Sequence, residues 1–558
     1  MAELNEESPE RLARPLIRLA QSLGVATSYV GMSRDFHEIP DDVLVAVLKA
    51  LNVDASSEET IEVSLEHVNN QRAMRLIEPT VLHIVGEQSH VPIHLAITEA
   101  PKVTITLEDG TIYQHDIAVE PLPDVKVHEV NGKFFSTAQI ALPADLPEGY
   151  HTLHIAAGQR EADATLISAP QRIPLLDPLK NGSLWGWMAQ LYSIRSADSW
   201  GVGDFADLRT LLIDSKRYTN ADFMLINPVH AGEPVSPLTP SPYLPVSRRF
   251  INYTYIHPED IPEYYALDDA AKQSVKDAHA KMEAYNADPN LIDRDAMWLE
   301  KEKALRTIFN TGLQSVRQQA FDDYKARCGE DLEAYATWCV CYAKWGKPEN
   351  TPDNWINKYT KDSPEVKQLR EQNSDLLEFY RWLEWIAVEQ MHAAQQAARQ
   401  AGMKIGIMSD MAVGVHPDGS EVWWNPERFA NGATVGAPPD MFNQQGQNWS
   451  QPPLSPLSLK ETGYKAYREM VRGMFDCAGA VRIDHILGLF RLWWIPEGQP
   501  ASNGTYVYYD HNTMLGILAI EADRVGGLIV GEGPRCRAVV RAAVARRLCH
   551  LRLRRRMV

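Results

Sequence analysis

Apolar and polar residues follow three successive patterns along the chain, and the first covers residues 1–75. Apolar positions there recur every three or four residues, as on one face of an α-helix. In the first predicted helix, which Gly24 ends, they are Leu16, Leu19, Ala20 and Leu23. A second helix is expected to begin at Pro40-Asp41-Asp42, with an apolar face of Val43, Val47, Leu48 and Leu51. We therefore predict a small N-terminal helical domain at residues 1–75.

Between residues 76 and 172 the pattern changes to a period of two, in which stretches of alternating apolar and polar residues indicate half-buried strands. Residues 103–107 alternate and then meet Asp109-Gly110, which is a turn signal for a β-hairpin leading into residues 111–113. Another alternating stretch lies at His151–Ile155. This pattern predicts a β-sandwich domain of immunoglobulin-like size at residues 76–172. It leaves open whether the domain binds sugar or is purely structural.

From residue 173 onwards, short apolar runs are separated by enough chain for helical crossovers, which parallel strands require. The predicted strands are Ala189–Ile194, Phe223–Val229, Ile405–Met411, Ala480–Asp484 and Leu528–Val530. An acidic segment at about residues 260–375 has helical periodicity, and we expect it to be an insertion between two strands. The pattern indicates an α/β domain at residues 173–532.

Composition and charge exclude several classes of protein. The 558 residues are 45% hydrophobic and 23% charged, as in ordinary globular proteins, with a net charge of −18. An acidic chain disfavours nucleic acid and anionic membranes as partners, and a neutral substrate suits it. No apolar run reaches the length of a membrane span, and the N-terminus lacks a signal-peptide pattern, so a cytoplasmic location is expected. The pattern does not predict an oligomeric state.

Metal and cofactor motifs do not appear in the sequence. The six cysteines have neither zinc-type spacing nor the pattern of a disulfide framework, and we expect free thiols. His392 has no second candidate ligand one helical turn away. Phosphate-binding and dinucleotide glycine patterns, and the nucleophile elbow of serine hydrolases, are missing too. The sequence therefore predicts no metal and no cofactor.

Arg482-Ile483-Asp484-His485 is the strongest local candidate for chemistry. Residues two apart on a strand share a face, so Arg482 and Asp484 are expected to point the same way. A guanidinium beside a carboxylate keeps the carboxylate ionised, which a carboxylate nucleophile needs. A buried structural ion pair at a strand end explains the same four residues, and the pattern leaves both interpretations open.

Glu532 follows the next predicted strand, so Asp484 and Glu532 would emerge at the same carboxyl-terminal edge of a parallel sheet. Retaining glycosidases need two such carboxyl groups, roughly 5 to 5.5 Å apart, as nucleophile and acid/base. Aromatic rings favour a sugar ligand as well, because sugar rings stack on them. We expect two or three of five tryptophans to contact ligand, namely Trp423, Trp424, Trp449, Trp493 and Trp494.

Several motifs together resemble the 4-α-glucanotransferases called amylomaltases, glycoside hydrolase family 77, of the bacterial maltose system. They span most of residues 170–532. The matching segments are SADSWGVGDFADL (196–208), INPVHA (226–231), SPYLPVSRRFINYTYI (241–256), SDMAVGV (409–415), GATVGAPPDMFNQQGQNWSQPP (432–453), GAVRIDHILGLFRLWWIP (479–496) and LIVGE (528–532).

The resemblance implies a (β/α)8 barrel of the TIM type with helical insertions, preceded by the helical and β-sandwich domains. It implies Asp484 as the nucleophile, Arg482 and His485 as its neighbours, and Glu532 as the general acid/base. Four more residues fall in motifs that line the sugar subsites: Tyr243, Asp410, Asp440 and Trp449. The implied activity is transfer of α-1,4-glucan segments between maltooligosaccharides.

The sequence departs from the family pattern at two places. Ser409 stands where relatives usually carry Arg. After Glu532 the family continues Asp-Leu-Gly and supplies a third carboxylate, whereas residues 533–558 contain nine Arg and no acidic residue. We interpret this segment as an aberrant tail that leaves the barrel incomplete, and we prefer a reading-frame shift to a basic binding arm. Two functions remain as alternatives to glucan transfer: an α-glucan hydrolase, and a catalytically inactive glucan-binding protein.

Overall fold

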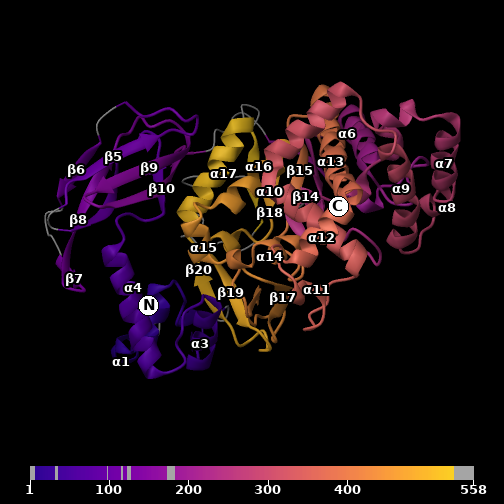
Figure 1. Ribbon diagram of the computed structural model, residues 1–558. Helices are drawn as coiled ribbons and strands as arrows, with labels where there is room; N and C mark the ends of the chain where they lie inside the picture. Colours follow the sequence, from indigo (N-terminus) through magenta and orange to yellow (C-terminus); the bar gives the residue numbers. More distant parts are fainter. Residues whose placement is uncertain are drawn as a thin grey trace.

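The computed structural model describes residues 7–31, 35–96, 99–114, 117–121, 127–172 and 183–532. The arginine-rich segment at 533–558 lies outside this range, as do Cys536 and Cys549. Figure 1 shows the N-terminal helices and a β-sandwich on one side of the molecule, and a group of helices on the opposite side. Among the described residues, no helix combines the length with the apolar content needed to cross a membrane.

The N-terminal helices form where the apolar periodicity predicts them. Leu16, Leu19 and Ala20 are buried on α2, and Gly24 follows that helix with a φ of +75°. The buried residues of the helices form one apolar core with residues of the α/β part, and the N–H of Ala26 also donates to the Tyr506 carbonyl. The elements are α1 (Pro9–Ala13), α2 (Pro15–Ser22), β1 (Ser28–Val30), β2 (Phe36–Glu38), α3 (Asp41–Ala50) and α4 (Glu58–Met74).

Two antiparallel-rich sheets between residues 80 and 169 bury a common apolar core and form the predicted β-sandwich. The predicted hairpin is present, since Thr106 pairs with Ile112 and Gly110 takes a φ of +85° in the turn. One sheet has the order β3-β10-β9-β5 and the other β4-β8-β6, with β7 beside β8. The strands are β3 (Thr80–Ile84), β4 (Ser89–Ala96), β5 (Pro101–Thr106), β6 (Ala118–Pro121), β7 (Val127–Val130), β8 (Lys133–Leu142), β9 (Gly149–Ala157) and β10 (Arg160–Ala169).

A parallel sheet of five strands, in the sequential order β11-β12-β15-β18-β21, carries the candidate site. Over residues 183–532 its two outer strands, β11 and β21, do not pair with each other, so the described sheet is open. Four crossover helices connect the strands: α6 (Phe205–Thr219), α13 (Ser374–Gln400), α16 (Lys465–Asp476) and α17 (His511–Val525). The strands are β11 (Gly186–Ala189), β12 (Phe223–Ile226), β15 (Gly406–Met411), β18 (Ala480–Ile483) and β21 (Leu528–Gly531).

The predicted strand at Ala189–Ile194 is wrong, because the chain leaves the sheet at Gln190. The strand lies earlier, and residues 191–193 form a short 3₁₀ helix. The side chain of Asn227 accepts the Leu191 N–H in place of a strand partner. Gly203 closes over this turn, and a Cβ on it would lie 2.0 Å from the Leu191 carbonyl oxygen. The other four predicted strands are confirmed to within a few residues.

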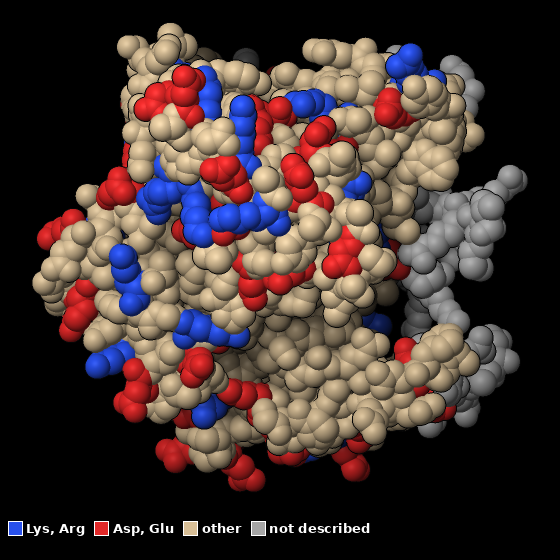
Figure 2. All heavy atoms as spheres, turned by 90° about the vertical axis from the view of Figure 1, so that its right-hand side faces the viewer, with Lys and Arg blue, Asp and Glu red and all other residues tan. Residues whose placement is uncertain are grey.

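The segment between β12 and β15 is mostly helical and forms the group of helices opposite the sandwich in Figure 1. Its helices are α7 (Asp269–Ala280), α8 (Glu283–Asn286), α9 (Arg294–Phe309), α10 (Ser315–Trp345), α11 (Trp355–Lys358) and α12 (Pro364–Gln372), after the 3₁₀ turns Tyr253–Tyr255, Pro258–Asp260 and Pro262–Ala266. A short antiparallel pair, β13 (His230–Ala231) and β14 (Ser247–Ile251), precedes them. Figure 2 shows acidic and basic side chains interspersed over this face.

Additional elements follow β15 and β18. The sheet β17-β16-β19-β20 packs against the N-terminal helices through α3. Its strands are β16 (Ala433–Ala437), β17 (Gln447–Gln451), β19 (Arg491–Pro496) and β20 (Thr505–Tyr508). The short helices nearby are α14 (Ser420–Trp424), α15 (Pro456–Glu461) and the 3₁₀ turns Pro426–Arg428 and Ile486–Leu489.

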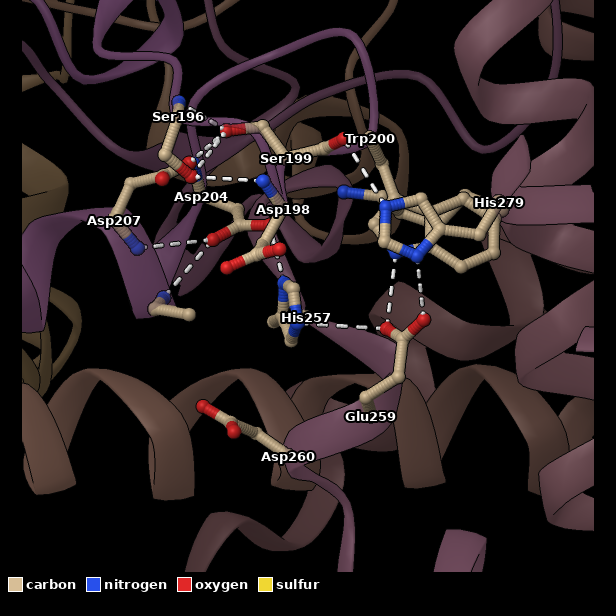
Figure 3. Close-up of polar contacts among 12 residues, drawn as sticks. Ser196, Asp198, Ser199, Trp200, Asp204, Asp207, His257, Glu259, Asp260 and His279 are labelled. Atoms are coloured by element: carbon tan, nitrogen blue, oxygen red, sulfur yellow. Dashed lines mark hydrogen bonds and ion pairs between the residues drawn. The ribbon is translucent and has the colours of Figure 1, made fainter. Parts of the chain in front are cut away.

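A buried charge network fastens the helical insertion to the N-terminus of α6 (Figure 3). His257 lies between two carboxylates, with its Nδ1 2.8 Å from Asp204 and its Nε2 3.4 Å from Glu259. His279 of α7 contacts the same Glu259 at 2.7 Å through Nδ1, and its Nε2 contacts the Ser199 carbonyl at 3.2 Å. Because every partner of these ring nitrogens is an acceptor, both imidazoles must be protonated to satisfy the network.

Candidate active site

Asp410, Arg482 and Val530 lie side by side on three neighbouring strands, since Asp410 pairs with Arg482 and Arg482 with Val530. In parallel strands, residues in register share a face. The same face holds a compact apolar cluster below them, which includes Met408, Ala480 and Leu528. Polar side chains therefore cap an apolar layer at the carboxyl-terminal edge of the sheet.

Arg482 bridges two carboxylates at this edge. Its Nη1 lies 2.5 Å from Oδ1 of Asp410, and its Nη2 lies 3.0 Å from Oδ1 of Asp484. The sequence prediction that Arg482 and Asp484 share a face is confirmed, and Ile483 between them packs into a core on the other face. A planar guanidinium can hold two acceptors in a fixed geometry, which an ammonium cannot.

Glu532 follows directly after β21, as Asp484 follows directly after the neighbouring strand β18. Ile483 pairs with Gly531, so the same register places the following residues, Asp484 and Glu532, beside each other. The backbone is fixed on both sides, because the Glu532 N–H donates to the Ile483 carbonyl at 2.9 Å and the Ile486 N–H donates to the Glu532 carbonyl at 3.1 Å. Neighbouring strands are about 4.8 Å apart, so the two carboxyl-bearing residues leave the sheet side by side.

The electrostatics of the site follow from burial and from three carboxylates around one guanidinium. Burial raises the pKa of Asp410 to about 6, although the adjacent Arg482 opposes the rise. Burial alone would lower the pKa of Arg482, but Asp410, Asp484 and Glu532 outweigh it, and the pKa is raised. Arg482 is therefore a permanent cation, whereas Asp410 can change its charge near neutral pH.

Tyr243 and Trp449 lie at the same edge of the sheet. The phenol of Tyr243 is 42% exposed, and its pKa is raised by partial burial and by the charges of Asp410 and Asp484. Trp449 stands edge-on to His485, with ring centroids 5.4 Å apart. The structure thus brings both residues to the Asp410–Asp484 group.

His485 follows Asp484 in a left-handed conformation with a φ of +48°, which turns the chain sharply after β18. Burial lowers the pKa of this imidazole. Asp440 belongs to the loop between β16 and β17, where its Oδ1 accepts the N–H groups of Phe442 and Asn443. Its described contacts stay within that loop and do not reach Asp484.

The four paired tryptophans are core residues. Trp423 and Trp424 are 8% and 6% exposed, and Trp493 and Trp494 are 1% and 0% exposed. The expectation that two or three of the five tryptophans contact ligand is therefore wrong, because only the half-buried Trp449 faces the site. Apolar run patterns cannot separate a ring that lines a cleft from one that fills a core.

Three buried residues near the site were missed by the sequence interpretation. Gln451 is 6% exposed, and its Nε2 donates to the Tyr243 carbonyl at 3.1 Å. His230 and Arg248 are 8% and 7% exposed and contact the segment directly after Asp410. All three lie within the matching segments of the sequence, which was the available signal, although the sequence does not show that they are buried or which groups they contact.

The described residues contain no group of three or more His, Cys, Asp or Glu side chains arranged to hold a metal ion. The thiols of Cys328, Cys339, Cys341 and Cys477 are free.

The chain is similar to several known proteins. A family profile for 4-alpha-glucanotransferase matches residues 189–534, and a profile for the MalQ N-terminal beta sandwich domain matches residues 76–170. A 4-alpha-glucanotransferase of Mycobacterium tuberculosis H37Rv is 38% identical over 532 residues, which cover 93% of this chain and 72% of that protein. One of Haemophilus influenzae is 34% identical over 414 residues, covering 72% of this chain and 59% of that protein.

A solved structure is similar as well. The crystal structure of amylomaltase from Corynebacterium glutamicum matches with a TM-score of 0.86 at 38% identity, covering 96% of this chain and 74% of that one. The chain belongs to the 4-alpha-glucanotransferase family. The resemblance inferred from the motifs is thereby confirmed, and the α/β part with its N-terminal β-sandwich has the fold of an amylomaltase.

Proposed function

We propose that this chain transfers α-1,4-glucan segments between maltooligosaccharides by a retaining double displacement. The observation that carries the proposal is the position of Asp484 and Glu532 in register at the ends of β18 and β21. Retaining enzymes separate their two carboxyl groups by about 5 to 5.5 Å, close to the strand spacing of about 4.8 Å. Family membership supports the same activity.

In the first displacement, a carboxylate oxygen of Asp484 attacks the anomeric carbon of the donor glucan. The glycosidic C–O bond breaks as Glu532 gives its proton to the leaving oxygen, and a covalent glucosyl ester forms on Asp484. Arg482 holds Asp484 in place through the 3.0 Å contact. Its fixed positive charge stabilises the ionised carboxylate that must attack.

In the second displacement, Glu532 takes the proton from the 4-hydroxyl of an acceptor glucan. The acceptor oxygen attacks the anomeric carbon, and the ester bond to Asp484 breaks. Two inversions restore the α-configuration. Transfer exceeds hydrolysis when a sugar occupies the acceptor site and excludes water.

The remaining predicted residues form the sugar subsites in this proposal. Asp410 accepts hydrogen bonds from sugar hydroxyls, Trp449 supplies a stacking surface, and Tyr243 borders the bond to be cleaved. His485 supports the turn that presents Asp484. Asp440 acts through its loop, whose Met441 and Phe442 are 63% and 80% exposed and can contact glucan chains.

We further propose that the five parallel strands belong to a (β/α)8 barrel. The sheet is buried on both faces, by the apolar cluster on one and by helices on the other, as parallel barrel sheets are. The domain divisions at residues 1–75, 76–172 and 173–532, the insertion at about 260–375 and the cytoplasmic location remain part of this proposal.

Incubation of the purified protein with maltotriose tests the function. Glucose together with oligomers longer than maltotriose demonstrates transfer, and Asp484→Asn must abolish it. Maltose and glucose without elongation would identify a hydrolase. Saturable maltodextrin binding without any product would identify an inactive glucan-binding protein.

A further inference from the structure

Arg248 of β14 is a buried cation whose guanidinium donates hydrogen bonds to backbone carbonyls. It is 7% exposed, and the structure gives its guanidinium no ion pair within 4.0 Å among the described residues, although the charge of Glu421 acts on it. Its Nη1 donates instead to two successive carbonyls, that of Val413 at 2.7 Å and that of Ala412 at 3.3 Å. These carbonyls begin two residues after Asp410.

His230 holds the other side of the same residue, Ala412, through the preceding peptide unit. The Ala412 N–H donates to His230 Nε2 at 3.3 Å, so this nitrogen must be unprotonated. A hydrogen bond also joins the His230 ring to the Arg248 backbone, and burial together with the Arg248 charge lowers the pKa of His230 to about 3. Arg248, His230 and Ala412 therefore form a closed ring of contacts.

This ring connects two parts of the site. His230 and Arg248 lie on the paired strands β13 and β14, and the loop between these strands carries Tyr243. On the other side, Met411 precedes Ala412, and its carbonyl accepts the Asp484 N–H at 3.3 Å. A shift of the Ala412 peptide would therefore move Asp410 and disturb the backbone contact of Asp484. Arg248 also lines the cavity that reaches Asp484 and His485.

We propose that Arg248 and His230 are positioning residues for glucan transfer, because they clamp the Ala412 peptide and so fix Asp410 and Asp484 relative to Tyr243. The proposal rests on the proposed function of the site. Neither side chain contacts the reacting atoms. A misplacement of about 1 Å can cost about 100-fold in rate, so loss of the clamp should appear mainly in kcat.

Arg249 provides a matched control on the same strand. Its side chain contacts Asp331 at 3.4 Å and the Glu469 carbonyl at 3.0 Å, away from the Ala412 peptide. Kinetics with maltotriose should be compared for Arg248→Met, Arg248→Lys and Arg249→Met, with the urea unfolding midpoint of each. Lysine keeps the charge and can donate to one carbonyl.

The clamp predicts that Arg248→Met lowers kcat by about 10- to 100-fold and changes KM by less than about threefold. Arg248→Lys should recover most of kcat, and Arg249→Met should stay within about twofold of the unaltered protein. The proposal is overturned if Arg248→Met keeps its kcat, if Arg249→Met loses as much, or if lysine recovers nothing.

A second measurement does not depend on activity. ¹⁵N NMR of the histidine rings, assigned with His230→Gln, should show His230 neutral with an unprotonated Nε2 at about pH 5. Its pKa should rise in Arg248→Met. If the protein shows no transfer but His230 behaves in this way, the proposed function fails and the clamp stands. If His230 is protonated at about pH 5, the clamp is absent, whatever the activity.

Discussion

Asp484 and Glu532 occupy matching positions at the ends of two adjacent parallel strands, where the Glu532 N–H donates to the carbonyl of Ile483, directly before Asp484. The backbone of the sheet, and not a flexible loop, therefore sets their separation. Sites built on strands are held more tightly than sites on loops. This relationship underlies the predictions for the site.

Arg482→Lys should lower the transfer kcat by about 100-fold, because a lysine cannot hold Asp410 and Asp484 together. Steady-state kinetics with maltotriose measures the loss. Arg491→Lys is a suitable control, since Arg491 lies over the Tyr506 ring and outside the site. Equal activity of Arg482→Lys and the unaltered protein would show that the double contact is unimportant.

Asp410 should give the pH profile of kcat/KM an acidic limb near pH 6. Burial raises its pKa to about 6, so the carboxylate that we propose to accept hydrogen bonds from sugar hydroxyls is lost as pH falls through that value. Asp410→Asn should lower kcat/KM and remove this limb. An unchanged limb in the variant would assign the titration to another group.

The charge network of Figure 3 should make the attachment of α7 depend on pH. Burial disfavours the charged imidazoles, but Asp204, Glu259 and Asp260 outweigh it at His257, and Glu259 does so at His279; both pKa values are raised. A histidine whose pKa is raised in the folded protein contributes stability that is fully present below the unfolded pKa of about 6.5. This stability is lost as pH rises through the folded pKa.

Hydrogen exchange measures this attachment locally. Protection of α7, corrected for intrinsic exchange rates, should be lower at about pH 9 than at about pH 6. In His279→Gln the difference should shrink, whereas His392→Gln, an exposed histidine on α13, should leave it unchanged. Equal protection of α7 at both pH values would contradict the role of the network.

Lys301→Met should lower the free energy of unfolding by about 3 kcal/mol, because it removes one of the cations that balance a group of buried carboxylates. Lys301 is 0% exposed and interacts with Asp204, Asp207 and Glu259. Urea unfolding measures the loss. Lys303→Met on the same helix is the control, since the Lys303 side chain is 56% exposed and the change should cost less than about 1 kcal/mol.

The sequence was most informative where one local pattern determines one local structure. Alternation in residues 480–484 predicted that Arg482 and Asp484 share a face, and the position of Glu532 after an apolar run predicted its place at the same edge. The motifs then identified the family. Local periodicity specifies strand faces because side chains alternate strictly along a strand.

Contacts between distant segments could not be predicted. Arg248 and Ala412 are 164 positions apart in the sequence. The periodicity of the two segments does not predict that they contact each other. The strand expected at Ala189–Ile194 failed for the same reason, since Asn227 and Gly203 shape that turn from outside it. The buried tryptophan pairs show that the sequence alone does not reveal whether an aromatic ring fills a core or lines a cleft.

The central claim, that Asp484 is the nucleophile beside the acid/base Glu532, is tested most directly by mass spectrometry of Glu532→Gln with α-maltotriosyl fluoride. Fluoride leaves without protonation, so the first displacement proceeds, while loss of the base slows the second. The account predicts a maltotriosyl ester on the peptide that contains Asp484. An adduct on another residue, or fluoride release without any adduct on that peptide, would contradict it.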